Sequence, residues 1–166
     1  PVPEPITVMH LRASNFVGGP EKQILEHLSR LDRKNFTPLL CTFGKDGCPD
    51  ELYEVGKEKG ICSFQLSGKS SFDLQQISRL RELMQQNAVK LLITHGYKAN
   101  IIGYIAARKI QVPEIAYSHG WTGENKKVIF FEMLDRQFMK LIRHIVAVSE
   151  GHGRQIVYAG ISEDKI

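Results

Sequence analysis

Residues 89–94 read Val89-Lys-Leu-Leu-Ile-Thr94, a short run that is apolar at nearly every position. A strand with one face in solvent alternates apolar and polar residues, whereas a strand covered on both faces is mostly apolar. The run leads through His95-Gly96 into a longer segment with helical periodicity. This stretch predicts a central strand of a parallel sheet, joined to its neighbour by a helix.

The same alternation of short β-branched runs and longer periodic segments extends in both directions along the chain. Further strands are expected at residues 6–11, 37–43, 61–66, 114–118 and 145–148. Helices are expected at residues 20–31, 50–59, 97–110, 125–141 and 149–158, with another that is capped by Ser71 or Asp73 and runs to about Asn87. Six strands alternating with helices indicate a doubly wound parallel α/β sheet, Rossmann-like, with helices on both faces.

Two of these helices have a clear apolar face. In the first, residues at helical spacing are Ile24, Leu25, Leu28 and Leu31. In the helix that ends near Asn87, the corresponding residues are Leu74, Ile77, Leu80, Leu83 and Met84. We expect both faces to pack against the sheet.

The composition is that of one soluble globular domain. The 166 residues are 42% hydrophobic and 24% charged, and no apolar run approaches the roughly 20 residues that cross a bilayer. The first residues, Pro-Val-Pro-Glu-Pro, do not have the pattern of a signal peptide. Three cysteines without CxxC spacing fit a reducing compartment. A net charge of +4 is compatible with phosphate-bearing ligands or an anionic membrane face but is too small to indicate nucleic acid.

Polar residues and glycines recur where the predicted strands end. The first strand leads into Ser14, Asn15, Gly18 and Gly19; three later strands end in Thr94-His95-Gly96, Ser118-His119-Gly120 and Ser149-Glu150-Gly151. In open parallel sheets, ligands bind beyond the carboxyl ends of the strands, near the point where the strand order reverses. Glycine allows a sharp turn and a close approach of a ligand to the backbone. The pattern therefore predicts one site along this edge.

Histidines are the ionisable residues with the most informative positions. His119 fits a general base, a neutral hydrogen-bonding group for a substrate, or a structural histidine, and its position at a strand end favours function. His95 is placed similarly, whereas His10 lies inside the first strand and is expected to be packed or to support the site. A metal site formed by His10, His95 and His119 is a weaker alternative, because no carboxylate set or characteristic spacing accompanies them.

Gly18 and Gly19 open the first helix and are followed by Pro20 and Glu21. Free backbone N–H groups at such a helix start can bind a phosphate, whereas the plainer interpretation is a glycine turn with Glu21 stabilising the helix dipole. A dinucleotide site is disfavoured, because GxGxxG is absent and no acidic residue ends the second strand.

The segment 125–143 combines the apolar run Val128-Ile-Phe-Phe131 with several basic residues. An apolar and basic helix can lie on an anionic membrane. The favoured interpretation is a helix packed on the sheet through Phe131, Leu134, Phe138 and Leu141, with its charged residues in solvent.

Taken together, three segments resemble a known family. The first strand followed by Gly18-Gly19-Pro20-Glu21, then Tyr117-Ser118-His119-Gly120, then Ile145-Val-Ala-Val-Ser-Glu150, is similar to the N-terminal domain of GT-B glycosyltransferases of family four. The resemblance covers nearly the whole chain in order. It implies a retaining transferase that uses a nucleotide sugar and needs no metal or other cofactor, with two Rossmann-like domains around a cleft.

The resemblance also implies roles for individual residues. His119 matches the family's active-site histidine, which contacts the transferred sugar or the acceptor, and Gly18 and Gly19 would approach the donor diphosphate. Residues implied on the acceptor side are Ser14, Asn15, Thr94, His95, Lys98, Ser149 and Glu150. Pro20 departs from the small residue more usual before the glutamate.

On this resemblance, residues 1–166 are a single acceptor-side domain, and the donor-binding domain has no counterpart in the sequence. The expected partners are a nucleotide-sugar donor, a glycan or lipid-linked acceptor and the missing C-terminal domain, at the cytoplasmic face of a membrane with peripheral contact as an option. The domain is expected to fold alone without turning over. The alternatives are a non-catalytic α/β ligand-binding or regulatory domain, and an epimerase or hydrolase of nucleotide sugars.

Overall fold

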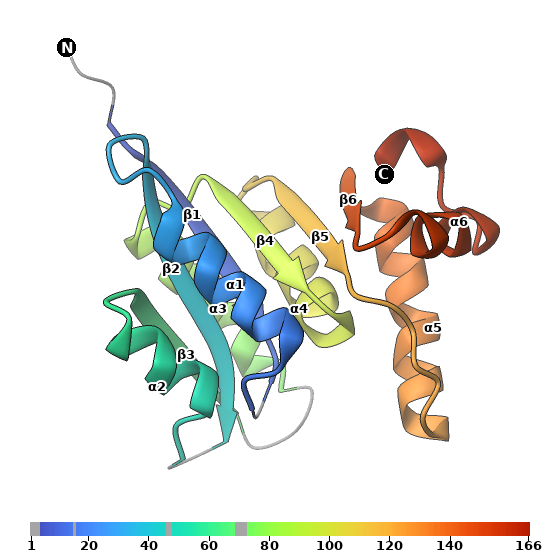
Figure 1. Cartoon of the computed structure of the whole chain (residues 1–166), viewed down its shortest axis with the longest axis horizontal. Coiled ribbons are helices and arrows are strands. Elements are labelled where there is room, and N and C mark those ends of the chain that lie inside the picture. The colour runs from blue at the N-terminus through green and yellow to red at the C-terminus, as the bar shows by residue number, and fades with distance from the viewer. Residues whose placement is uncertain (1–3, 15, 46–47, 69–72) are drawn as a thin grey trace.

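The computed structural model of the chain describes residues 4–14, 16–45, 48–68 and 73–166, which form a six-stranded sheet with helices on both faces (Figure 1). The strands are β1 (Ile6–Arg12), β2 (Phe36–Lys45), β3 (Cys62–Gly68), β4 (Leu91–His95), β5 (Glu114–Ser118) and β6 (His144–Ala147). The helices are α1 (Gly19–Arg30), α2 (Glu51–Glu58), α3 (Gln75–Gln86), α4 (Tyr97–Lys109), α5 (Lys126–Leu141), α6 (Glu150–Tyr158) and a short 3₁₀ turn at Glu163–Lys165.

The strand order is β3-β2-β1-β4-β5-β6, and each neighbouring pair is parallel. The order reverses between β1 and β4, where Arg12 is paired in register with His95. The doubly wound Rossmann-like sheet predicted from the sequence is therefore confirmed, and its switch point lies between these two strands.

The core has three parts. Two of them lie on opposite faces of the sheet, because β2 sends alternate side chains to opposite faces. Leu40 packs under α1 and α2 together with Ile24, Leu28 and Leu52. On the other face, under α3 and α4, the cluster includes Met9, Leu11, Leu39, Cys41, Leu80, Met84, Leu92 and Ile102. The third cluster joins β5 and β6 to α5 and α6 through Ala116, Met139, Ile142, Ile145 and Ile156. Burial of each large side chain stabilises the fold by about 1.5–3 kcal/mol.

The start of α3 differs from the prediction. Leu74 is 79% exposed at the N-cap rather than part of the buried face, although Leu80 and Met84 are buried as expected. Asp73 Oδ1 accepts a hydrogen bond of 2.9 Å from the backbone N–H of Gln75, so the helix begins after Leu74 and directs that side chain away from the sheet. The other predicted cap, Ser71, lies outside the described residues.

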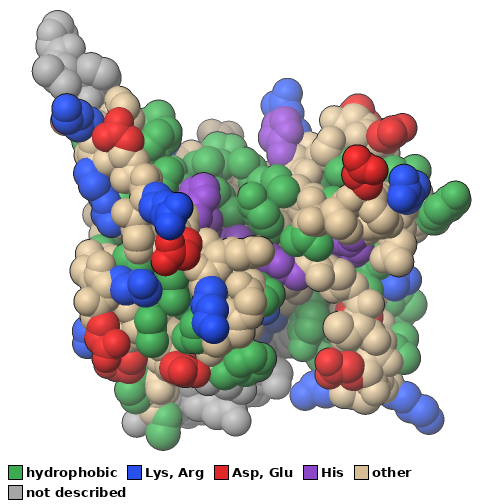
Figure 2. Space-filling model, viewed as in Figure 1, with side chains coloured by type: hydrophobic (Ala, Val, Ile, Leu, Met, Phe, Trp, Pro, Cys, Tyr) green, Lys and Arg blue, Asp and Glu red, His purple; other side chains and the backbone are tan. Residues whose placement is uncertain are grey.

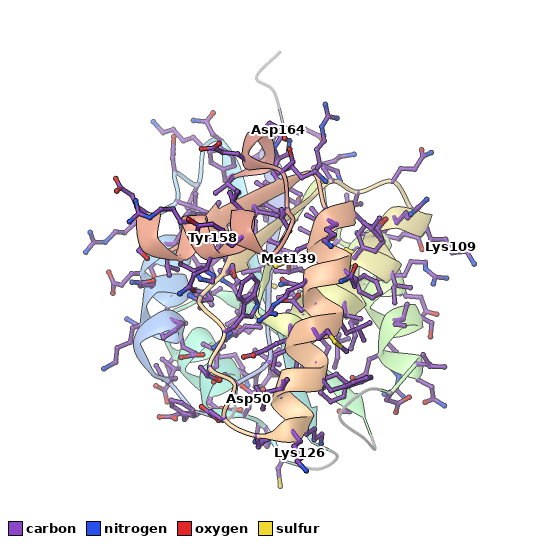
Figure 3. All side chains as sticks on the ribbon, turned by 90° about the vertical axis from the view of Figure 1, so that its right-hand side faces the viewer. Asp50, Lys109, Lys126, Met139, Tyr158 and Asp164 are labelled. Atoms are coloured by element: carbon purple, nitrogen blue, oxygen red, sulfur yellow. The ribbon has the colours of Figure 1, made fainter. Side chains whose placement is uncertain are left out.

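Helix α5 also packs differently from the favoured interpretation. Its buried residues are Glu132, Asp135 and Met139, while Leu141 is 57% exposed. Phe131 and Phe138 are only half-buried, with their rings against Tyr97 and Tyr104 of α4. Compared with the predicted orientation, the helix is turned so that Glu132 and Asp135 face the interior, where both carboxylates accept hydrogen bonds. Figure 3 shows the segment after β5 running alongside α5 to its first turn at Lys126. Among the described residues, no helix is long and apolar enough to span a membrane.

Candidate functional site

A cleft of about 1290 Å³ lies at the carboxyl ends of β1, β4 and β5. One side is formed by the residues after β1 and by the start of α4, and the other by the segment after β5 and by α5. Figure 2 shows the surface hollowed between these two parts, with histidine side chains in between. The polar and charged residues lining it are Arg12, Ser14, His95, Lys98, Asn100, Ser118, His119, Thr122, Glu124, Lys127, Glu132 and Asp135. The cleft therefore lies at three of the four strand ends named from the sequence, those of β1, β4 and β5.

His119 follows the last residue of β5 and lines the cleft. Gly120 has a φ of 109°, which a residue with a side chain rarely adopts, so glycine is needed for the turn that presents this ring. Burial, and then the nearby Arg12 charge, lower the pKa of His119 to about 4. At neutral pH the ring is therefore an uncharged hydrogen-bonding group.

His95 and His10 extend from His119 into the core. His95 is only 3% exposed; its Nδ1 is 3.0 Å from His119 Nε2, and its Nε2 is 2.9 Å from His10 Nδ1. His10 is 2% exposed and does not reach the cleft, as its place inside the first strand suggested. These nitrogens are bonded to one another in pairs and do not converge on a common point. Within the described part of the chain, no group of three or more potential ligands could hold a metal ion, so the three-histidine metal site is not formed.

Arg12 is a cleft residue that the sequence reasoning missed. Its Nε and Nη2 are each 2.8 Å from Oε1 of Glu21, and its Nη1 donates to the backbone oxygen of His95 at 3.2 Å. Glu21 is 1% exposed, so the pair fixes the guanidinium at the switch point. The signal was available in the sequence, because Arg12 ends the first strand as His95 ends the fourth.

The glycine pair lies beside the cleft but does not line it, although Phe16 and Pro20 do. The N–H of Gly18 is not free, because it donates to Oε2 of Glu21 at 3.0 Å. A Cβ at Gly18 would come within 2.8 Å of the Phe16 ring, whereas one at Gly19 would meet nothing within 4 Å. Of the two glycines, only Gly19 is open to an approaching group.

Lys98 and Ser14 line the cleft as expected. Nζ of Lys98 is 4.3 Å from the centre of the Phe43 ring, and burial lowers the pKa of this amine to about 8. The hydroxyl of Ser14 donates to the Phe16 carbonyl at 2.7 Å. Asn15, also expected on the acceptor side, lies outside the described residues.

The structure does not bring the other three expected acceptor residues into the cleft. Thr94 is fully buried, and its hydroxyl donates to Oε1 of Glu114 at 3.1 Å. Ser149 and Glu150 are exposed at the start of α6, where Ser149 Oγ accepts the His152 N–H at 3.2 Å. Strand β6 lies at the edge of the sheet, beyond β5. Its carboxyl end is therefore removed from the switch point, although its sequence resembles the other strand ends.

Two carboxylates of α5 complete the second side of the cleft. Oε1 of Glu132 accepts the Thr122 N–H at 2.7 Å, and its Oε2 accepts the Gly123 N–H at 3.3 Å. Asp135 Oδ1 accepts from Asn100 at 2.9 Å, and burial raises the pKa of Asp135 to about 6. The apolar residues of this helix predicted a different inner face, so neither carboxylate was expected in the cleft.

Comparisons with known proteins agree with this architecture. The model of the family Glycosyltransferase Family 4 matches residues 17–166. Among solved structures, HepE of Anabaena in complex with UDP-glucose superposes with a TM-score of 0.78 at 13% identity, covering 96% of this chain and 42% of HepE. A glycosyltransferase from Rickettsia africae gives 0.76 at 17% identity, covering 98% and 42%. A UDP-N-acetylglucosamine 2-epimerase from Rickettsia bellii gives 0.68 at 14% identity, covering 98% and 44%. No curated protein sequence gave a significant match.

These structural likenesses, all below 25% identity, show the fold alone, and transferases and an epimerase share it. The chain spans about two fifths of the length of each of these proteins. It matches half of a GT-B architecture, as expected from the sequence. The family model is more specific, because it covers nearly the whole chain, including β4, β5 and the residues after them that line the cleft. The chain therefore belongs to Glycosyltransferase Family 4.

Proposed function

We propose that this chain is the acceptor-side domain of a glycosyltransferase that moves a sugar from a nucleotide-sugar donor to a glycan or lipid-linked acceptor. The observation that carries the proposal is the neutral ring of His119 near the charge of Arg12, in a cleft at the switch point that Lys98 also lines. A sugar hydroxyl bonds well to an uncharged imidazole, and fixed cations stabilise negative charge that develops on a leaving diphosphate. HepE, which shares the fold, was determined with UDP-glucose, and a donor of that class suits this cleft.

The residues divide into two roles. His119 contacts the transferred sugar or the acceptor, and Gly19 lies where a diphosphate could approach the backbone at the start of α1. His95, Lys98 and Ser14 line the acceptor side of the cleft, to which the family resemblance also assigns Asn15. The proposal includes a donor-binding domain outside these residues, since the chain covers only 42% of HepE, and the 166-residue chain alone is then expected to be inactive.

We further propose, from the family resemblance, that transfer retains the anomeric configuration and requires no metal. Anomeric coupling constants of the first-formed product report the stereochemistry, and dialysis against a chelator reports the metal requirement. An inverted product, or activity that is lost on chelation and restored by a divalent cation, contradicts this part of the proposal.

The central experiment compares His119→Ala with wild type in the full-length protein, using a panel of nucleotide sugars and lipid-linked acceptors. Loss of an active-site group that handles protons or orients the sugar is expected to lower kcat about 100-fold or more. The thermal unfolding midpoint serves as the folding control, because His119 is only half-buried. Unchanged turnover by a folded variant removes His119 from the mechanism.

An epimerase of nucleotide sugars is the second candidate, because the Rickettsia bellii epimerase has the same fold. Product analysis with and without acceptor separates the two activities. A transferase forms glycosylated product only when acceptor is present, whereas an epimerase converts the nucleotide sugar by itself. A domain that binds these ligands and turns over neither would be the non-catalytic alternative.

We also propose peripheral contact with an anionic membrane surface, and the outer face of α5 supports it. Ile129, Phe130 and Met133 are each more than half exposed, and Lys126 and Lys127 are exposed beside them. Apolar side chains flanked by lysines favour an anionic lipid surface. Sedimentation of the full-length protein with vesicles tests this. Binding to phosphatidylglycerol vesicles but not to phosphatidylcholine vesicles is expected, and its persistence in Phe130→Ser/Met133→Ser would contradict the assignment.

A further inference from the structure

His10, His95 and His119 form a hydrogen-bonded series that we name the histidine row. Its two bonds have the same polarity: Nδ1 of His10 meets Nε2 of His95, and Nδ1 of His95 meets Nε2 of His119. The ring centroids are 5.1 and 5.3 Å apart with interplanar angles of 21° and 27°, so the rings lie nearly coplanar and meet edge to edge. The row runs from the core of β1, through the end of β4, to the cleft.

The three rings are neutral at physiological pH. Burial lowers the pKa of His10 to about 3, with a further contribution from His27. Burial also lowers the pKa of His95 well below its usual value, assisted by His10, His119 and Arg12. A neutral imidazole has one N–H donor and one bare acceptor nitrogen. Each ring of the row therefore has a single proton to place.

These facts leave only two arrangements for the whole row. If His10 donates from Nδ1, then Nε2 of His95 must accept, so His95 carries its proton on Nδ1 and donates it to Nε2 of His119. Nδ1 of His119 then carries a proton as well. If the bonds run the other way, all three rings carry the proton on Nε2 and Nδ1 of His119 is bare. A mixed state breaks one buried hydrogen bond and leaves its ring nitrogens without partners, which is unfavourable.

We propose that His10 and His95 are positioning residues that hold the His119 ring in one orientation and in one tautomer, the same in all three rings. His119 Nδ1 then offers the cleft either a fixed donor or a fixed acceptor. His10 takes part in this coupling although it does not line the cleft. The functional consequence rests on the proposed function, whereas the tautomer coupling itself does not.

Ring nitrogen NMR of the full-length protein with ¹⁵N-labelled histidine tests the coupling directly, because protonated and bare ring nitrogens have well-separated shifts. His119→Gln assigns the His119 signals by their disappearance. In wild type, the three rings are expected to show the same nitrogen protonated. His10→Phe removes the buried partner, so the His119 signals should move toward the average of two tautomers, whereas His10→Asn, with an amide near the position of Nδ1, should restore much of the wild-type pattern.

His27→Phe is the matched control. The His27 ring contacts that of His10, with centroids 5.1 Å apart and an angle of 46°, but no hydrogen bond joins the two among the described residues. This variant should leave the His119 signals unchanged. Different tautomers within the wild-type row, or His119 signals that do not respond to His10→Phe, would overturn the proposal.

Steady-state kinetics give the functional readout. His10→Phe should lower kcat/KM about fivefold to tenfold, the equivalent of one hydrogen bond, at a temperature where unfolding shows the variant to be native. His27→Phe should not change it. If His119→Ala kept full turnover, the proposed function would fail while the NMR result on the row still stood. If His119 were essential but His10→Phe had wild-type kinetics, the positioning role would fail alone.

Discussion

Arg12 and Glu21 form an ion pair that joins the end of β1 to the start of α1, with Nη2 and Nε both 2.8 Å from the same carboxylate oxygen. The carboxylate is 1% exposed and the guanidinium 18%. The other oxygen of Glu21 accepts the Gly18 N–H, so a single side chain fixes both the cleft cation and the helix start.

Glu21→Gln should therefore destabilise the chain strongly. The amide can still accept from Gly18, but the Arg12 charge loses its partner, and breaking a buried pair costs about 3 kcal/mol or more. Urea unfolding measures the change. Glu26→Gln is the matched control, because Glu26 pairs with Arg30 at 3.1 Å on an exposed surface, where the loss is less than about 1 kcal/mol. Equal effects of the two substitutions would contradict the importance of the buried pair.

The same ion pair should make the stability of the folded chain depend on pH, in a direction that follows from the pKa of Glu21. Burial raises the pKa of Glu21, but Arg12 and the hydrogen bonds to the carboxylate outweigh it and hold the pKa below its ordinary value of 4.5. The stability that Glu21 contributes is present above pH 4.5 and is lost as the pH falls through the folded-state pKa. Glu21→Gln should reduce the loss of stability in this acidic range, as followed by urea midpoints on either side of pH 4.5.

Glu114 should make stability depend on pH in the opposite direction to Glu21. Burial raises its pKa from 4.5 to about 8, so the folded chain keeps this carboxyl protonated where the unfolded chain ionises it. Its contribution is present below pH 4.5 and is lost as the pH rises toward 8. Glu114→Gln, which resembles the protonated acid, should stabilise the chain more at pH 8 than at pH 4.5. A stability difference from wild type that is the same at both pH values would contradict the shift.

Lys98 should limit the binding of anionic ligands in alkaline solution. Burial lowers its pKa to about 8, so its charge is present below this pH and is lost above it. In the full-length protein, KM for an anionic acceptor should therefore rise as the pH passes 8, and Lys98→Arg, which does not titrate in this range, should delay the rise. A wild-type profile that Lys98→Arg leaves unchanged would assign the dependence to another group.

Gly18 and Gly19 should respond differently to alanine. At Gly18, a Cβ meets Phe16 at 2.8 Å and Glu21 at 3.1 Å, so Gly18→Ala should lower stability. At Gly19, a Cβ would meet nothing within 4 Å, so Gly19→Ala should unfold like wild type. The same variant should raise the donor KM of the full-length protein if the diphosphate approaches the backbone at this position. An unchanged donor KM in Gly19→Ala would place the diphosphate elsewhere.

The residues that the sequence reasoning placed correctly are those whose position follows from the strand pattern. The runs at 89–94 and 114–118 fixed the central strands, and parallel strands bring their carboxyl ends together, so His95 and His119 were found at one edge of the sheet. Thr94 was predicted to lie in the cleft, but it is not there. Successive side chains along a strand point to opposite faces of the sheet, and that of Thr94 is buried against Glu114.

Residues whose role depends on packing between distant helices could not be found in this way. Glu132 and Asp135 lie on a helix whose apolar residues suggested another inner face, and only the positions of Asn100 and Thr122 explain why the carboxylates are buried. Ser149 and Glu150 were predicted at the site but lie outside the cleft. A polar pair at a strand end indicates a site only near the switch point, and β6 lies at the edge of the sheet.

The contacts between α5 and the segment after β5 limit how the width of the cleft can change. Glu132 binds the N–H groups of Thr122 and Gly123, and Arg136 lies 4.3 Å from the centre of the Trp121 ring. On this side of the cleft, the segment and its helix are therefore expected to move together. If the proposed function is correct, this side of the cleft would open for a sugar by displacement of the helix together with the segment, a slower and larger motion than that of a surface loop.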